Sequence, residues 1–197
     1  MSRYASLADV RDYLGFSGTL GQVQDGLLQD CLNRAESAID QYTRRNFAGT
    51  AGTVYYNRFV QDHQLADQAL YLDTDLHTLV ALRNGDETVI PVGSTWLEPQ
   101  GQPPYRLIRL KSQYAWVWNT DSNVIISGTF GFSTVAPDDI MQATVRLASH
   151  YFRMKDAGGY QDQAGFPEAG EVTIGRGMPD DVRYALNPYR SRTGGIV

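Results

Sequence analysis

The stretch from Gln22 to Phe47 constrains the fold most, because its apolar residues repeat with the period of an α-helix. They recur at steps of three and four residues and form one stripe, which consists of Val23, Leu27, Leu28, Cys31, Leu32, Ala35, Ala38, Ile39 and Tyr42. The polar residues of the stretch, Glu36 and Asp40 among them, are expected mostly to face away from this stripe. An apolar stripe of this length must be buried, so we predict one long amphipathic helix that packs against a second helix.

A second helix is predicted from Asp138 to Met154, the only other segment of comparable length and period. Asp138 and Asp139 follow Pro137, where acidic groups complement the N-terminus of a helix. Its apolar positions are Ile140, Met141, Val145, Leu147, Ala148, Tyr151 and Phe152. A third, shorter helix is expected from Leu7 to Leu14, because Ser6 can cap its start and Gly15 can end it.

The residues between the two long helices carry strand and turn signals. Short strands are expected at Val54–Val60, Ala69–Leu72, Leu79–Arg83, Thr88–Val92, Tyr105–Leu110, Ala115–Trp118 and Val124–Phe132. A hairpin is expected at Asn84-Gly85, because both residues tolerate a positive φ. Short antiparallel strands in close succession are typical of a small sandwich or barrel.

We therefore predict an α+β fold, in which an antiparallel helical bundle of two long helices and the short N-terminal helix carries an inserted antiparallel β sandwich or barrel. The predicted domains are the bundle at residues 1–52 and 134–157, the β domain at 53–133 and, at 158–197, an extended C-terminal tail that includes a short helix. Residues 158–177 contain six glycines and few large apolar groups, so they are expected to be extended or mobile. A last short helix is expected from Met178 to Leu186.

The charge balance limits the possible functions. The chain has 17 basic and 22 acidic residues and a net charge of -5, which argues against a protein that coats DNA through a basic surface. A single cysteine, Cys31, rules out an intramolecular disulfide and a multi-cysteine zinc site. We find no signal peptide, lipidation motif or membrane-spanning run, and therefore expect a protein that is soluble and intracellular where it is made.

No catalytic constellation is apparent, and we expect neither an enzyme nor a bound cofactor or metal. Asp73, Asp75 and His77 could ligate a metal, but they fit a turn at a strand end equally well and lack the glycine and terminal glutamate of a calcium loop. His63 and His150 have no carboxylate or cysteine pattern nearby. Arg44 and Arg45 could contact phosphate, although their place at a helix C-terminus also explains them.

Several segments together resemble the head–tail connector family of tailed bacteriophages, also called adaptor or head-completion proteins. The resemblance lies in the order and spacing of Tyr13-Leu14-Gly15, residues 34–40, Arg44-Arg45-Asn46-Phe47, residues 70–76, residues 128–133, Pro137-Asp138-Asp139-Ile140, residues 143–155 and Leu186-Asn187-Pro188-Tyr189-Arg190. It implies a virion protein of the neck that forms a dodecameric ring below the portal. It also implies that the C-terminal segment docks on the portal protein, that a stopper or tail-completion protein binds the opposite side, and that DNA passes through the lumen.

Two sets of residues are predicted to serve such an assembly. The portal-binding candidates are Val182, Leu186, Tyr189, Arg190 and Arg192. The candidates for the interface between subunits are Ser37, Ala38, Tyr42, Tyr151 and Phe152. A net acidic lumen would repel the duplex and let it slide without sequence-specific binding, and no membrane partner is expected.

Two other functions compete with this one. A β module that binds carbohydrate or a host surface would use Trp96, Trp116 and Trp118 as exposed aromatic groups, although Trp116 and Trp118 also suit the core of a sandwich. A metal-dependent hydrolase would use Asp73, Asp75 and His77. Quenching of tryptophan fluorescence by sugar would favour the first function, and tight binding of a divalent metal would favour the second.

Overall fold

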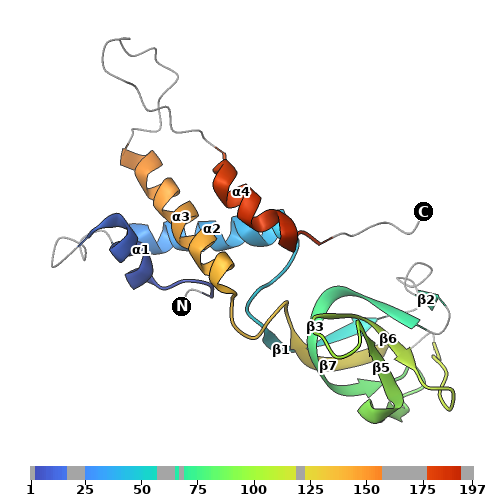
Figure 1. The fold of residues 1–197 in the computed structure, drawn as a ribbon. Coiled ribbons are helices and arrows are strands. Elements are labelled where there is room, and N and C mark those ends of the chain that lie inside the picture. Colours follow the sequence, from blue (N-terminus) through green and yellow to red (C-terminus); the bar gives the residue numbers. More distant parts are fainter. Residues whose placement is uncertain are drawn as a thin grey trace, which may run out of the picture. The chain divides into compact units, whose positions relative to one another are not determined.

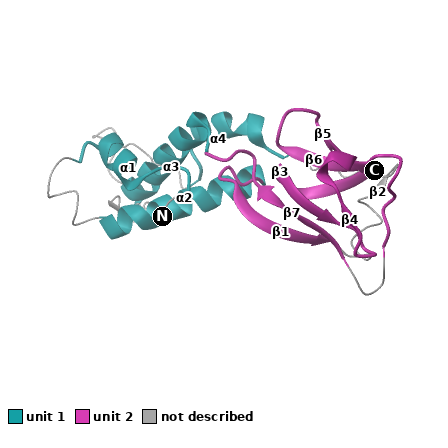
Figure 2. Ribbon diagram, turned by 90° about the horizontal axis from the view of Figure 1, so that it is seen from below, with its two compact units in different colours: residues 1–44, 136–191 teal, residues 45–135, 192–197 magenta. Residues whose placement is uncertain are grey.

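The computed structural model describes residues 3–16, 25–56, 65–66, 69–118, 123–156 and 177–191. The chain divides into two compact units, shown in separate colours in Figure 2. We call residues 1–44 and 136–191 the helical unit, and residues 45–135 with 192–197 the sheet unit. That residues 53–133 fold as an independent domain stays a prediction.

Within its described residues, the helical unit contains four α-helices and a final 3-10 turn (Figure 1). They are α1 (Leu7–Leu14), α2 (Asp25–Thr43), α3 (Asp138–Asp156), α4 (Asp180–Leu186) and η4 (Asn187–Tyr189). The predicted caps of α1 are confirmed. The Ser6 hydroxyl accepts from the Asp9 backbone N–H at 3.2 Å, the Asp9 carboxylate accepts from the Ser6 N–H at 2.8 Å, and Gly15 ends the helix with φ 73°.

Helix α2 packs on α3 through the apolar stripe that the sequence predicted. Its buried apolar residues are Leu28, Cys31, Leu32, Ala35 and Ile39, and those of α3 include Ile140, Ala143, Leu147, Ala148 and Phe152. Each large aliphatic side chain buried in this way stabilises the unit by about 1.5–3 kcal/mol. Helix α2 ends at Thr43 rather than at Phe47, because Arg44 has a φ of 56° and leaves the helical conformation. Residues 22–24, which were expected to begin it, lie outside the described residues.

The described part of the sheet unit contains seven strands in one antiparallel sheet. The strands are β1 (Thr50–Tyr56), β2 (Leu65–Ala66), β3 (Ala69–Arg83), β4 (Val89–Ile90), β5 (Thr95–Glu98), β6 (Tyr105–Leu110) and β7 (Val124–Phe130), with a 3-10 turn, η3, at Val92–Ser94. The order across the sheet is β1-β7-β3-β6-β5, and the short strands β2 and β4 also pair with β3.

Strand β3 organises the sheet unit because it pairs with different neighbours along its 15 residues. Its first part pairs with β6 and its later part with β7. The register with β7 shifts between Leu76 and Thr78 and again between Leu79 and Ala81, and such irregularities bend a strand. The core includes the fully buried residues Leu70, Leu76, Leu82, Ile90, Ile108, Val124 and Ile126.

The fold predicted from the sequence is wrong. In place of a bundle of two long helices with an inserted sandwich or barrel, the described residues form four helices, of 8, 19, 19 and 7 residues, and one antiparallel sheet. Two predicted strands, Ala69–Leu72 and Leu79–Arg83, are parts of the continuous β3, so the chain between them does not turn to start a second sheet. The short helix predicted from Met178 to Leu186 is present as α4, and residues 158–176 and 192–197 of the predicted tail lie outside the described residues.

Three other strand predictions also need correction. Strand β1 spans Thr50–Tyr56 and therefore begins four residues before the predicted start at Val54. Residues 115–118 form no strand. The hairpin after β3 is confirmed by the pairing of Arg83 with Val89, but its positive φ falls on Glu87 and not on Asn84-Gly85.

Asn84 explains the shape of this hairpin. Its side chain is 3% exposed, donates to the Ala115 carbonyl at 2.9 Å and accepts from the Val117 N–H at 3.0 Å. The side chain is therefore used to hold the segment that follows β6, and a tight two-residue turn is not formed. Among the described helices, none is long and apolar enough to cross a bilayer.

Candidate assembly surfaces

Helix α4 is fixed on the helical unit by one apolar face. Val182 and Leu186, two of the predicted portal-binding residues, are 1% and 0% exposed. The helix packs against α3 and α2, and the Arg146 guanidinium of α3 pairs with Asp181 at 2.9 Å. A partner could contact Val182 or Leu186 only if α4 left this position. The opposite face is open, since Tyr184 is 75% exposed.

The residues after α4 are held by polar contacts with α2 and α3. The Tyr42 hydroxyl donates to the Asn187 side chain at 2.6 Å, and the Ser191 N–H donates to the Thr43 carbonyl at 2.8 Å. The Tyr189 hydroxyl donates to Asp139 at 3.3 Å. Burial raises the pKa of Tyr189, and the negative charge of Asp139 raises it further.

Arg190 remains exposed at the end of this segment, with its guanidinium 5.2 Å from the centre of the Tyr42 ring. Such a cation–π contact restricts a long side chain while leaving its donors available. Arg192 lies outside the described residues. Of the five portal-binding candidates, Val182 and Leu186 are thus buried. Tyr189 and Arg190 lie near the surface, and the structure does not describe the fifth. Their role in binding a portal stays a prediction.

The five candidates for a subunit interface lie on α2 and α3 and differ in exposure. Ser37 is exposed, and Ala38, Tyr42 and Tyr151 are half-buried. Tyr151 lies under the Arg34 guanidinium, 4.4 Å from the ring centre. Phe152 is 3% exposed and packs edge-to-face on Phe16 at 5.6 Å. Ser37 and Tyr151 can therefore contact a neighbouring copy, whereas Phe152 packs within its own chain.

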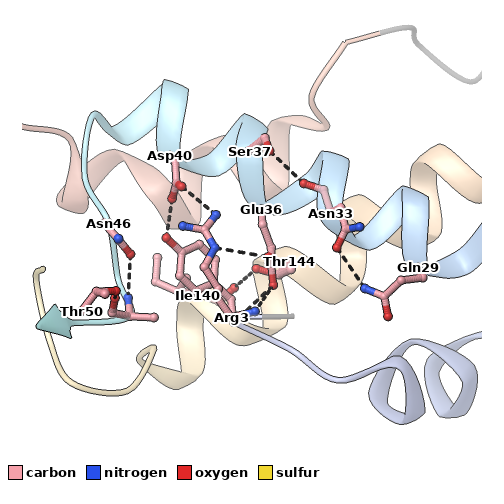
Figure 3. A network of polar contacts seen from close by, with 12 residues as sticks. Arg3, Gln29, Asn33, Glu36, Ser37, Asp40, Asn46, Thr50, Ile140 and Thr144 are labelled. Carbon is pink, nitrogen blue, oxygen red and sulfur yellow. Dashed lines mark hydrogen bonds and ion pairs between the residues drawn. The ribbon is translucent and has the colours of Figure 1, made fainter. Parts of the chain in front are cut away.

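A buried carboxylate that the sequence analysis missed ties the N-terminal segment to α2 (Figure 3). Glu36 is 4% exposed and accepts from the backbone N–H groups of Arg3 and Tyr4 at 2.6 and 2.9 Å. The Arg3 guanidinium donates to Asp40 at 2.8 Å. Burial lowers the pKa of Arg3, but the hydrogen bond and charge of Asp40 outweigh this and raise it. Nothing in the apolar period of α2 marks Glu36 as buried.

The Asp73, Asp75 and His77 cluster does not form a metal site. Asp75 is buried and pairs with Arg45 at 3.0 Å and with Arg106 at 2.9 Å. Asp73 is exposed, and in the described residues no group of three potential metal ligands comes together. Burial lowers the pKa of Arg45, and the nearby Arg106 charge adds to this, while Asp75 counteracts it. Arg45 thus belongs to a structural ion pair rather than to a helix terminus. His63 lies outside the described residues.

The three tryptophans do not form one exposed surface. Trp116 and Trp118 stack on each other with ring centres 6.4 Å apart, and both are partly buried against the core of the sheet. Trp96 is 47% exposed, and the Lys111 ammonium lies 4.8 Å from its ring centre. One exposed tryptophan under a lysine offers little area for a sugar, so this arrangement does not favour carbohydrate binding.

The outer edge of β1, which no described strand covers, is a second candidate assembly surface. Strand β1 pairs with β7 in unbroken register from Thr50 to Tyr56, and no described strand pairs with its other edge. Residues 50–53 are exposed and Tyr55 is 62% exposed. The strand carries no charge, proline or bulge, which are the features that normally protect an edge from pairing with another chain.

Comparison with solved structures finds the same fold in gene transfer agent particles. A chain in the neck of an empty gene transfer agent particle, with C6 symmetry, superimposes with a TM-score of 0.61 and 21% identity over 94% of this chain and 88% of that one. A chain in the neck of the native particle, with C12 symmetry, superimposes with a TM-score of 0.61 and 21% identity over 94% of this chain and 87% of that one. A chain of the native gene transfer agent virion superimposes with a TM-score of 0.61 and 19% identity over 94% of this chain and 88% of that one.

This chain has the fold of a neck chain. The likeness covers both units, because it spans 94% of the sequence. No protein-family model matches the chain, and no curated protein is detectably similar to it.

Proposed function

We propose that the chain is a structural, non-enzymatic subunit of the neck of a tailed phage-like particle, where copies form a ring between capsid and tail. The observation that carries this proposal is the fold shared with a gene transfer agent neck chain along nearly the whole length of both chains. The order of segments that resembles head–tail connectors supports it independently. Twelve copies are proposed, because one of the similar necks has C12 symmetry.

Ring closure requires two different surfaces of one copy to meet on the next. We assign the edge of β1 to one of these surfaces, because its unprotected backbone groups would be covered by a neighbour. The exposed side of α2 and α3 around Ser37 and Tyr151 supplies further contacts. Variants that place a charge on the edge, such as Thr53→Lys, are expected to reduce assembly without unfolding the exposed strand.

Portal docking is assigned to the segment after α4. In this proposal Val182 and Leu186 hold the helix on its own subunit, and Tyr189, Arg190 and Arg192 contact the portal. Arginines suit this role because a planar guanidinium binds carboxylates through two parallel hydrogen bonds. The stopper or tail-completion protein would bind the opposite side of the ring. The net charge of -5 would let DNA pass without adhering.

The docking step can be tested by binding of the full chain to the portal protein of the same particle. Replacing Arg190 and Arg192 by glutamine should weaken binding at least about tenfold, as expected for the loss of charge-assisted hydrogen bonds. Arg109→Gln is a matched control, because Arg109 is a partly exposed arginine of the sheet unit that pairs with Glu98 at 3.3 Å. Equal binding by the double variant and the control would contradict the docking proposal.

A further inference from the structure

The helical unit contains a small cavity of about 250 Å³ whose lining comes from α1, α3 and the start of α4. Its polar lining residues are Tyr13, Arg146, Ser149, His150, Arg153 and Asp181. Four of these lie on α3 at positions 146, 149, 150 and 153, a spacing that places them on one face of the helix. The cavity therefore collects hydroxyl, imidazole and guanidinium donors along two turns of one helix.

Two of these donors have no hydrogen-bond partner among the described residues. Ser149 is 2% exposed, and its hydroxyl oxygen is shielded from solvent and unpaired. The Nε2 atom of His150 is likewise buried and unpaired. Buried polar groups without a partner destabilise a protein, and nearly all such groups in proteins are satisfied. The Ser149 hydroxyl, and His150 with its ring proton on Nε2, can each donate a hydrogen bond to a ligand in this cavity.

The charges around the cavity select the kind of ligand. Arg146 pairs with Asp181 at 2.9 Å, and Arg153 is exposed with no ion-pair partner among the described residues. The hydrogen bond between Tyr13 and Arg146 raises the pKa of the Arg146 guanidinium, and the charge of Asp181 raises it further, so Arg146 stays protonated. The two arginines and one aspartate of the lining sum to one positive charge. This charge matches a monoanion better than the dianion of a phosphate.

We propose that this cavity binds a single carboxylate group, carried by an aspartate or glutamate side chain of a protein partner. The Arg153 guanidinium forms the ion pair with the carboxylate, and the Ser149 hydroxyl and His150 Nε2–H donate hydrogen bonds to it. Asp181 holds Arg146 in place and disfavours a polyanion such as duplex DNA. The site does not depend on ring formation, so its failure would leave the neck proposal unaffected.

The test uses the full chain and saturation-transfer NMR with a blocked Gly-Glu-Gly peptide as the probe. Transfer to the glutamate methylene protons is expected, and the matched Gly-Gln-Gly peptide should bind about tenfold more weakly because it lacks the charge. Equal binding of the glutamine peptide would overturn the proposal. Displacement of the glutamate peptide by inorganic phosphate or duplex DNA at lower concentration would also overturn it, in favour of a phosphate site.

Two variants locate the binding within the cavity. Arg153→Gln changes an exposed residue and should weaken peptide binding about tenfold without affecting the fold. Ser149→Ala removes an unpaired buried hydroxyl, so it should leave the melting temperature equal or higher while weakening binding several-fold. Arg109→Gln in the sheet unit should bind like the wild type. Unchanged affinity in both cavity variants would contradict the proposal.

Discussion

The helical unit and the sheet unit are stabilised in different ways. In the helical unit, a buried carboxylate on α2 binds backbone groups of the N-terminal segment, as Glu36 does with Arg3 and Tyr4. In the sheet unit, the β7 backbone at Gly128 lies so close to the β3 backbone that an added Cβ would be 2.1 Å from the Thr78 carbonyl oxygen. The helical unit should therefore be sensitive to loss of the Glu36 carboxylate, and the sheet unit to volume added at Gly128.

The largest effect is expected from Gly128→Ala. The new methyl group would overlap the backbone of β3, so β7 must shift, and the free energy of unfolding should fall by about 3 kcal/mol or more. Gly52 is a matched control, because it pairs with Gly128 across the ladder and its Cβ would meet nothing nearer than 3.8 Å. Urea unfolding measures both variants. Similar stability of Gly128→Ala and Gly52→Ala would refute the close approach.

The second effect tests the helical unit. Glu36→Ala leaves the N–H groups of Arg3 and Tyr4 without their acceptor, and we expect a loss of about 2 kcal/mol. Gln41→Ala, at an exposed position on the same helix, should change stability by less than about 0.5 kcal/mol. Thermal unfolding distinguishes the two variants. If the two variants have the same melting temperature, the N-terminal segment is not held by Glu36.

The third prediction concerns alkaline pH and the sheet unit. Burial raises the pKa of Tyr56 to about 12, from 10.0 for an exposed tyrosine. The unfolded chain therefore releases this proton first, and stability falls as the pH rises from about 10 to about 12. At about pH 11 the loss should be about 1.4 kcal/mol. Tyr56→Phe should remove this part of the pH dependence, and an unchanged dependence would count against the burial of the hydroxyl.

The smallest effect is expected at the start of α1. Ser6→Ala removes the N-cap and should lower the stability of the helical unit by about 1 kcal/mol. The hydrogen bonds from the Ser6 hydroxyl and N–H lower the pKa of Asp9, so their contribution is present at neutral pH and is lost as the solution is acidified through that pKa. Ser37→Ala, an exposed position within α2, is the control. Equal melting temperatures of Ser6→Ala and Ser37→Ala at neutral pH would show that the N-cap does not stabilise the helical unit.

The sequence predicted those features that depend on neighbouring residues. Ser6 and Gly15 mark the ends of α1 by local rules, and the apolar stripe of α2 follows from helical period alone. The Asp138 start of α3 and a short helix ending at Leu186 were found in the same way. These signals lie within a few residues of the structure that they specify, so no tertiary information is needed.

The features that the sequence did not predict depend on residues distant in the chain. From the sequence, Asp75 was interpreted as part of a turn or a metal site. In the structure it pairs with Arg45 and Arg106, which are 30 and 31 residues away in the chain. The β3 strand passes through Leu72 and Leu76 without a break because β6 and β7 pair with its two parts, and neither partner is evident locally. Of the candidate assembly residues, the exposure of Ser37 and the burial of Phe152 followed only from the packing of α2 and α3.

The most direct test of the neck assignment is electron microscopy of the purified chain mixed with the portal protein of its own particle. The account predicts a ring of this chain on one end of the portal, with twelvefold symmetry and with the segment after α4 at the contact. A chain that stays monomeric and unattached when the portal is present, or that covers DNA instead, would contradict the account.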